Sequence, residues 1–407
     1  MSRPTFVTVG AGQTAAVAAR TLRRKGFDGR IVLVGDEPHL PYQRPPLSKE
    51  FLGGAEPEDS LWLLPERWRA DNDVEILTGV VVTRVDPATR TVECDGRTPL
   101  SADAVLFATG GSPRRLAVPG PRPELVHYLR TLDDARRLAP LLVPGRRLAV
   151  IGAGFIGLEI AATATAAGVE VTVLEAAPVP LAGAIGAQMG AMVTALHRER
   201  GVDVRVGAAV ESVRTTDTGV VIEIVGNATP LEADAVLIGI GITPNVTAAT
   251  ASGLRVDDGI VVDALGCTSI PGVYAAGDVA RRHSARAGAH VRVEHFDNAS
   301  RQGAAVAGAM LGLSVASDEP HWFWSDQFDH NIQLLGSARG TPVLRGDRDG
   351  KDFTAFYFDG PLLCGAFTVD RGEDISAARE MLGRPVDAAA LADEDVDIWD
   401  LALGVSA

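Results

Sequence analysis

Two glycine-rich segments of this sequence have the residue types and the spacing needed to bind a pyrophosphate. The segments GAGQTA at 10–15 and GAGFIG at 152–157 each follow a short apolar stretch and precede an alanine-rich stretch. The first glycine allows a tight turn, the second lets the backbone approach a phosphate, and the third small residue lets the following helix pack closely. These positions are Gly10, Gly12 and Ala15 in the first segment and Gly152, Gly154 and Gly157 in the second. The helix that starts at each loop would point amide donors at the phosphates.

Carboxylates follow both loops at roughly the 20-residue spacing typical of ribose binding. Glu175 ends the stretch VEVTVLE, and the AAPVP that follows has no arginine or lysine for a 2′-phosphate, so we predict NADH there. After the first loop, Asp36 is the preferred ribose ligand and Glu37 the alternative. The segment VYAAGDV predicts a buried strand ending near Asp278, whose carboxylate would bind a sugar-like hydroxyl such as the ribityl chain of a flavin. We therefore expect FAD at the first loop and NADH at the second.

The elements that must position these residues are duplicated along the chain. Each loop lies between a predicted strand and a predicted helix, and ADAVLFATG at 102–110 has a counterpart in ADAVLIGIG at 233–241. Beyond residue 321, short apolar alternations such as FTAFYF predict an antiparallel sheet, with a closing helix near ISAARE. The fold class is α/β, with two Rossmann-like dinucleotide-binding domains and a C-terminal α+β domain. The expected boundaries are 1–113 and 239–320 for the two segments of the FAD-binding domain, 114–238 for the NAD-binding domain and 321–407 for the C-terminal domain.

The composition excludes several classes of function. The 407 residues include 38 basic and 52 acidic side chains, a net charge of −14 that disfavours nucleic acids and anionic membranes as partners. No apolar run approaches the roughly 18 residues of a membrane span, and MSRPTFVTVG does not resemble a signal peptide. The cysteines are far apart and the histidines lack ligand spacing, so we expect no metal and a cytoplasmic protein.

The segment GDEPHLPYQRPPLSKEF at 35–51 contains three prolines, one lysine and no cysteine. The prolines stiffen the chain, and Ser48 is expected to cap a new helix.

With these motifs in place, the chain resembles the two-dinucleotide-binding flavoproteins of the glutathione reductase superfamily. More closely, it is similar to the NADH-dependent ferredoxin reductases of bacterial oxygenase systems, of the putidaredoxin reductase and biphenyl dioxygenase reductase type. The motifs that carry the resemblance extend over the whole chain: GxGxxA at 10–15, RPPLSK at 44–49, ATG at 108–110, YLRTLDDA at 128–135, GAGFIGLE at 152–159, AAGD at 275–278 and WFWSDQ at 322–327.

The resemblance assigns cofactor contacts to particular residues. The residues that it places against FAD are Asp36, Arg44, Lys49, Val82, Ala108, Thr109, Gly110, Arg130, Asp278, Glu294, His295 and Trp324. The residues that it places against NADH are Gly154, Ile156, Gly157, Glu159, Glu175 and Gly241. Phe296 is also assigned to the flavin environment, at a position where family members often have tryptophan, and the arginine often found after Glu175 is missing.

The resemblance also gives Lys49 a role. Disulfide reductases of the superfamily have redox cysteines in the region where this chain has Lys49, so electrons must leave the flavin without a thiol relay. An ammonium near flavin N5 would favour the anionic reduced flavin, and Glu159 is the expected partner that keeps Lys49 protonated. We therefore expect Lys49 and Glu159 to be the catalytic residues, with hydride passing from NADH to the flavin and electrons leaving singly.

The implied partner is a two-iron ferredoxin that serves a cytochrome P450 or a Rieske oxygenase, with the reductase a monomer or a homodimer. The densest arginine run, Arg281, Arg282, Arg286, Arg292 and Arg301, forms either a docking face or a solvated surface. Two alternatives are a reductase of rubredoxin or of a small organic acceptor, and an NADH-sensing flavoprotein similar to apoptosis-inducing factor.

Overall fold

The computed structural model describes residues 3–313 and 318–404. The chain divides into two compact units, each assembled from three segments. The first unit comprises Met1–Pro45, Pro57–Ser112 and Ile242–Glu319, and the second comprises Pro46–Glu56, Pro113–Gly241 and Pro320–Ala407. The segment that carries Lys49 therefore belongs to the second unit, and the C-terminal residues group with the NAD-binding segment rather than alone.

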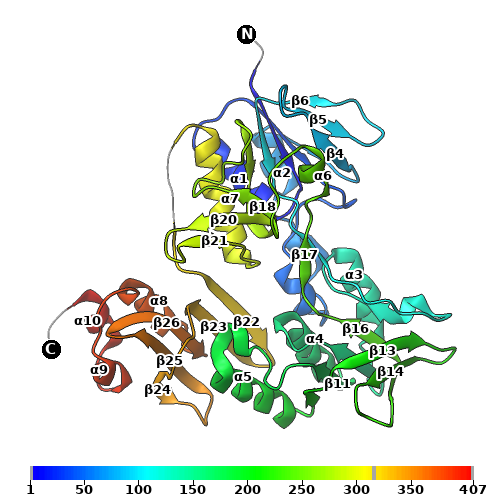
Figure 1. Ribbon diagram of the computed structural model, residues 1–407, viewed down its shortest axis with the longest axis vertical. Helices are drawn as coiled ribbons and strands as arrows, with labels where there is room; N and C mark the ends of the chain where they lie inside the picture. The colour runs from blue at the N-terminus through cyan, green and yellow to red at the C-terminus, as the bar shows by residue number, and fades with distance from the viewer. Residues whose placement is uncertain (1–2, 314–317, 405–407) are drawn as a thin grey trace. The chain divides into compact units, whose positions relative to one another are not determined.

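The first unit is built on a five-stranded parallel sheet with the order β19-β7-β1-β2-β3. Its strands are β1 (Thr5–Val9), β2 (Arg30–Val34), β3 (Val74–Leu77), β7 (Ala104–Phe107) and β19 (Val273–Ala275). Helices α1 (Gln13–Arg24) and α7 (Phe296–Met310) pack side by side (Figure 1), and their apolar side chains share one core with one face of the sheet. The opposite face packs against an antiparallel sheet of β4 (Val82–Val85), β5 (Thr91–Cys94) and β6 (Leu100–Ser101).

The second unit repeats the order of four of these strands, as the duplicated segments predict, and differs only in where its fifth strand lies in the chain. Its parallel sheet has the order β12-β11-β10-β16-β9. The strands are β9 (Val126–His127), β10 (Arg147–Ile151), β11 (Glu170–Glu175), β12 (Asp203–Val206) and β16 (Ala235–Ile238), and the main helices are α4 (Phe155–Ala166) and α5 (Ala182–Glu199). Ala104 pairs with Phe6 in the first sheet, as Ala235 pairs with Leu148 in the second, so the two copies of the ADAV sequence occupy equivalent strands.

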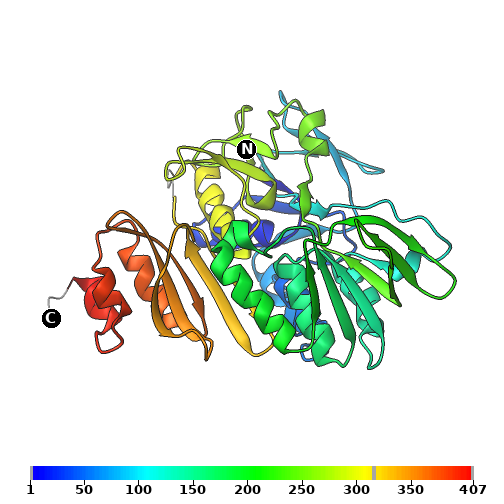
Figure 2. The ribbon, with the colours of Figure 1, turned by 60° about the horizontal axis from the view of Figure 1, so that its bottom comes forward.

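The C-terminal part forms a five-stranded antiparallel sheet with the order β22-β23-β26-β25-β24. Its strands are β22 (Trp322–Gln327), β23 (His330–Gly336), β24 (Val343–Asp347), β25 (Asp352–Asp359) and β26 (Leu362–Val369). Helices α8 (Gly372–Met381), α9 (Ala388–Ala392) and α10 (Ile398–Leu403) cover this sheet, as the orange and red parts of Figure 2 show. The predicted sheet and its closing helix are confirmed.

Shorter elements complete the two units. They are α2 (Glu66–Asp71), α3 (Leu132–Leu138), α6 (Thr247–Ala251), β8 (Gly111–Pro113), β13 (Val210–Thr215), β14 (Val220–Ile224), β15 (Leu231–Ala233), β17 (Ile242–Pro244), β18 (Ile260–Val262), β20 (Ala280–Ser284) and β21 (Ala289–Val291). Single 3₁₀ turns lie at Pro45–Ser48, Glu58–Leu61, Pro123–Leu125, Ala139–Leu141 and Gly277–Val279.

Candidate active site

The two glycine loops have matching backbone geometry. Gly10 and Gly152 have φ values of +104° and +100°, a region that favours glycine, and a Cβ atom at either would lie within 2.4 Å of a carbonyl oxygen. Their amides donate to the ends of the neighbouring strands, Gly10 N to Val34 O at 2.7 Å and Gly152 N to Leu174 O at 2.8 Å. These contacts hold both loops in the same tight turn.

The second glycine of each loop faces open space. A Cβ atom at Gly12 or Gly154 would meet no atom within 4 Å, so the backbone remains accessible to a bound group. These two residues are the N-caps of α1 and α4, and neither helix has a side-chain cap or an acidic residue in its first turn. Both helix N-termini therefore keep amide donors and a positive dipole end, which fits a pyrophosphate.

Glu175 is the last residue of β11, and its carboxylate holds the second loop in place. Its Oε2 accepts a hydrogen bond from Ala153 N at 2.8 Å, and its Oε1 accepts one from Ala177 N at 2.8 Å. A carboxylate has further lone pairs for a ribose hydroxyl, and its negative charge opposes a 2′-phosphate. This geometry fits NADH.

The two carboxylates after β2 differ in their surroundings. Asp36 is exposed, whereas Glu37 accepts hydrogen bonds from Tyr42 Oη at 2.5 Å and Arg44 Nη2 at 2.6 Å. Arg44 is thereby held at a fixed position in the first unit. Asp278 lies in the single turn that follows β19, where Gln302 Oε1 accepts a hydrogen bond from Gly277 N at 2.8 Å. The predicted buried strand before Asp278 is present.

The remaining residues predicted to contact FAD in the first unit lie at the ends of its strands and at the start of α7. Thr109 is fixed by Asn245, because Thr109 Oγ1 donates to the carbonyl of Asn245 at 2.7 Å and Asn245 Nδ2 donates to the carbonyl of Thr109 at 2.9 Å. His295 is the N-cap of α7. The others in this group are Val82 on β4, Ala108 and Gly110 beside Thr109, Glu294 before α7 and Phe296 at its first position.

Lys49 and Glu159 form a buried ion pair inside the second unit. Lys49 Nζ lies 3.3 Å from Glu159 Oε1, and the side chains are 9% and 4% exposed. Ser48 Oγ donates to Glu159 Oε2 at 2.5 Å, and Ser325 Oγ donates to Glu159 Oε1 at 2.6 Å. Burial raises the pKa of Glu159, and the charge of Lys49 and the two serine donors oppose that rise. The pairing of Lys49 with Glu159 predicted from the sequence is present.

The prediction that Ser48 caps a helix is wrong. Residues Pro45–Ser48 form one 3₁₀ turn, and turns rather than a helix follow over residues 49–54, because the Ser48 hydroxyl is bound to Glu159 and not to a backbone amide. Instead, the Ser48 side chain binds Glu159, and the Ser48 carbonyl accepts a hydrogen bond from Thr163 Oγ1 at 2.8 Å. The sequence signal for this site is the pair of polar residues Ser325 and Gln327, which occupy alternate, buried positions of β22 together with Phe323.

The other predicted residues of the second unit are Trp324, Ile156, Gly241 and Arg130. The Lys49 ammonium lies 5.8 Å from the centroid of the Trp324 ring, and Trp324 Nε1 donates to Asp326 Oδ2 at 3.2 Å. Ile156 is 45% exposed beside the second loop. Gly241 has φ of +95°, and its carbonyl accepts a hydrogen bond from Arg114 N at 2.9 Å. Arg130 precedes α3, where its amide donates to Asp134 Oδ2 at 3.1 Å.

The arginine run is already compensated by acidic groups and carbonyls of the first unit. Arg281 pairs with Asp257, Arg282 donates to the carbonyl of Ala264, Arg286 binds Asp318, Arg292 pairs with Asp258 and Glu294, and Arg301 pairs with Asp297 and Glu319. This arrangement weakens the hypothesis that the run is a docking face, because these guanidinium groups already bind acidic side chains or backbone carbonyls of the same unit.

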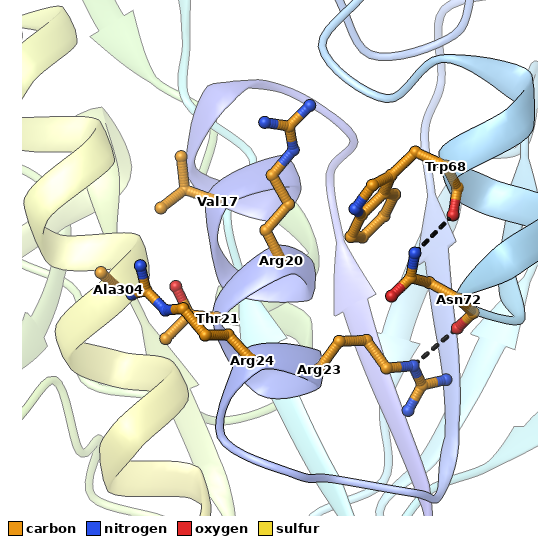
Figure 3. A pocket seen from close by; sticks show the side chains of 8 residues that line it. All are labelled: Val17, Arg20, Thr21, Arg23, Arg24, Trp68, Asn72 and Ala304. Carbon is orange, nitrogen blue, oxygen red and sulfur yellow. Dashed lines mark hydrogen bonds between the residues drawn. The ribbon is translucent and has the colours of Figure 1, made fainter.

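A cavity of about 470 Å³ lies elsewhere in the first unit, between α1 and α2 (Figure 3). Its lining residues are Val17, Arg20, Thr21, Arg23, Arg24, Trp68, Asn72 and Ala304, none of which is among the predicted site residues. Over residues 3–313 and 318–404, no group of three His, Cys, Asp or Glu side chains has an arrangement suited to a metal ion. No helix in those ranges has the length and apolar character of a membrane span.

Comparison with known proteins identifies two family models in the chain. A model described as pyridine nucleotide-disulphide oxidoreductase matches residues 4–303, and one described as Reductase C-terminal matches residues 322–402. The chain is 38% identical over 397 residues to rhodocoxin reductase of Rhodococcus erythropolis, covering 97% of this chain and 93% of the relative. It is 39% identical over 404 residues to the ferredoxin–NAD⁺ reductase component of the anthranilate 1,2-dioxygenase system of Burkholderia cepacia, covering 98% and 99%.

Solved structures agree with this assignment. The reductase in the covalent putidaredoxin reductase–putidaredoxin complex superposes with a TM-score of 0.92 at 35% identity, covering 99% of each chain. The ferredoxin reductase for the CYP199A2 system from Rhodopseudomonas palustris also gives a TM-score of 0.92, at 34% identity, covering 98% of this chain and 99% of that one. The chain therefore belongs to the pyridine nucleotide-disulphide oxidoreductase family, within the group of ferredoxin–NAD⁺ reductases that carry a Reductase C-terminal domain.

Proposed function

We propose that this chain is an FAD-dependent NADH:ferredoxin oxidoreductase whose acceptor is a two-iron ferredoxin serving a cytochrome P450 or a Rieske dioxygenase. The names of the relatives support this proposal. The observation that carries it is that two dinucleotide-binding units occur together with a buried Lys49, and without a cysteine, in the segment that follows β2.

The two nucleotides are assigned to different units. In the first, FAD would be held by the loop at 10–15, by Asp36 or Glu37, by Arg44 and by Asp278. In the second, NADH would be held by the loop at 152–157 and by Glu175, whose position at the end of β11 supports NADH over NADPH. The open sides of the second glycines support the approach of a pyrophosphate to both loops.

Bound FAD supplies the conversion of a hydride donor into a source of single electrons. The chain's own residues orient NADH and provide charge. Glu175 aligns the ribose, and the α4 N-terminus binds the pyrophosphate. Glu159 holds the Lys49 ammonium in place, so that a cation is positioned to stabilise the negative charge that hydride transfer generates. We also assign Trp324, whose ring adjoins this cation, to the flavin environment.

The cysteines support an external electron acceptor. Cys94, Cys267 and Cys364 are all unpaired, and burial raises the pKa of each thiol, so their thiolate forms are disfavoured at neutral pH. None lies in the segment around Lys49. Electrons would therefore pass to another protein rather than to a dithiol within the chain. Free thiols and the use of NADH also support a cytoplasmic location.

The test is NADH-driven reduction of a panel of two-iron ferredoxins by the FAD-loaded protein, followed by stopped-flow absorbance. We expect NADH to reduce the flavin and at least one ferredoxin to reoxidise it rapidly. Turnover with rubredoxin or a small organic radical, and with none of the ferredoxins, would favour the alternative reductases. A long-lived complex of reduced flavin and NAD⁺ that ignores all of these acceptors would favour an NADH sensor.

A further inference from the structure

A continuous row of buried hydrogen bonds connects Glu159 with His197 inside the second unit. Ser325 Oγ donates to Glu159 Oε1 at 2.6 Å, Gln327 Nε2 donates to Ser325 Oγ at 3.0 Å, and His197 Nε2 lies 2.9 Å from Gln327 Oε1. The four residues are at most 3% exposed. They come from α4, β22 and α5, so the row joins three separate elements.

The hydrogen bond that Ser325 Oγ donates to the Glu159 carboxylate fixes the direction of every other bond in the row. A carboxylate only accepts, so the single hydroxyl proton of Ser325 is used on Glu159. The Ser325 oxygen must then accept from the amide nitrogen of Gln327, which turns Gln327 Oε1 toward His197. His197 Nε2 therefore carries a proton and donates it to Gln327 Oε1. All three donors point toward Glu159.

The row places polar side chains of β22 in the protein interior, where their burial lowers stability unless they are hydrogen-bonded. Phe323, Ser325 and Gln327 are the inward-facing residues of the strand, and two of these three are polar. Buried polar groups lower stability unless they are hydrogen-bonded, and apolar side chains would pack here without that requirement. Within the described residues, His197 Nδ1 is buried and has no hydrogen-bond partner, so His197 makes its one side-chain hydrogen bond in the row.

We propose that Ser325, Gln327 and His197 are positioning residues that act through Glu159, holding its carboxylate ionised and oriented toward Lys49. Because the Gln327 amide is not a titratable group, the row orients charge and does not conduct protons. The catalytic consequence rests on the proposed function, since only flavin reduction by NADH would use the charge on Lys49. The effect on Glu159 itself does not depend on turnover.

The direct test is an infrared pH titration of the Glu159 carboxyl group, identified as the carbonyl band that Glu159→Gln removes. Loss of the Ser325 donor disfavours the carboxylate, so we expect the titration midpoint of Ser325→Ala to move to higher pH. Gln327→Met, which weakens the Ser325 donor indirectly, should move it by less. A wild-type midpoint in both variants, in protein that melts cooperatively, would overturn the proposal.

Thr368→Val is the matched control for this titration. Thr368 is a fully buried hydroxyl in the same antiparallel sheet, and its Oγ1 donates to the carbonyl of Phe353 at 3.0 Å, with no connection to Glu159. Its loss should lower stability without moving the Glu159 midpoint. A midpoint shift as large as that of Ser325→Ala would mean that any buried hydroxyl of the sheet produces the effect, which would also contradict the proposal.

The kinetic test uses Glu159→Gln as a background. Ser325→Ala should lower the rate constant of flavin reduction on the order of 10-fold, with the Kd for NADH unchanged because the loop at 152–157 is intact. In Glu159→Gln protein, Ser325→Ala should cause no further loss. Equal losses in the two backgrounds would show that Ser325 does not act through Glu159. If NADH does not reduce the flavin at all, the proposed function fails, while the infrared titration still decides this inference.

Discussion

Glu159 Oε1 lies 3.3 Å from Lys49 Nζ, and the two side chains are only 4% and 9% exposed. A buried pair of this kind contributes little net stability, because the loss of hydration offsets most of the attraction between the charges. The removal of one partner is different, since it leaves a buried charge without compensation. Replacement of either residue alone should therefore lower stability strongly. The intact pair holds the Lys49 ammonium at one position.

Lys49→Met should lower both stability and the rate of flavin reduction. We expect the free energy of unfolding to fall by about 3–5 kcal/mol. The rate constant of flavin reduction by NADH should fall on the order of 100-fold, because a preorganised positive charge is lost. Urea unfolding and stopped-flow absorbance measure the two effects.

Two further variants control this prediction. Lys351 pairs with Glu199 at 2.7 Å, and Glu199 is 57% exposed, so Lys351→Met should cost less than about 1 kcal/mol and leave the rate unchanged. Lys49→Met combined with Glu159→Gln should be more stable than Lys49→Met alone, since no unpaired charge remains. Equal stability of the single and double variants would contradict the assignment of a buried charge pair.

Gly154→Ala should separate folding from nucleotide binding. A Cβ atom at Gly154 meets no atom within 4 Å and the backbone φ is −74°, so the fold should be retained. The added methyl group would occupy the side from which a pyrophosphate approaches, and the Kd for NADH should rise by about 10-fold or more. Gly183→Ala in α5 also meets no atom within 4 Å and should change neither property. Unaltered NADH binding by Gly154→Ala would argue against this loop as the pyrophosphate site.

Glu175 should determine the preference for NADH. Glu175→Ala removes the acceptor for the Ala153 and Ala177 amides as well as the charge that opposes a 2′-phosphate. We expect kcat/KM for NADH to fall on the order of 10- to 100-fold, and the NADH/NADPH ratio of kcat/KM to fall with it. Steady-state assays with both nucleotides measure this. A variant that loses activity with both nucleotides equally would assign Glu175 to loop structure alone.

Features set by local spacing were predictable from the sequence. The loops at 10–15 and 152–157 fix the turn, the open face and the helix start together. The repeated ADAV sequence forms equivalent strands, β7 and β16, each paired with the strand that precedes a glycine loop. The alternation of apolar residues after residue 321 predicts an antiparallel sheet because side chains alternate between the two faces of a strand.

Features set by contacts between distant segments were not predictable in the same way. Ser48 has the residue type of a helix cap, and only the packing of its segment against α4 shows that it binds Glu159. The row from Ser325 to His197 depends on the register of β22 and on the position of α5. Likewise, the arginine run around Arg281 is basic in sequence, but two of its acidic partners, Asp257 and Asp258, come from a different segment.

His197 should make stability depend on pH in a direction that follows from its burial. Burial lowers the pKa of His197, so the unfolded chain binds this proton more tightly than the folded chain. The stability associated with neutral His197 is therefore present above the unfolded pKa of about 6.5 and is lost as the pH falls toward the folded value. Acidification from about pH 7.5 to about pH 5.5 should thus lower the free energy of unfolding.

His197→Gln removes the titrating group while it keeps an amide donor for Gln327. The loss of stability on acidification should be smaller in this variant than in the wild type, as measured by urea unfolding at a series of pH values. His127 is also buried with a pKa lowered by desolvation, but it is common to both proteins and cancels in the comparison. Parallel pH profiles for wild type and His197→Gln would mean that His197 takes up a proton as readily in the folded as in the unfolded protein, and the attribution of this pH dependence to burial of His197 would then be wrong.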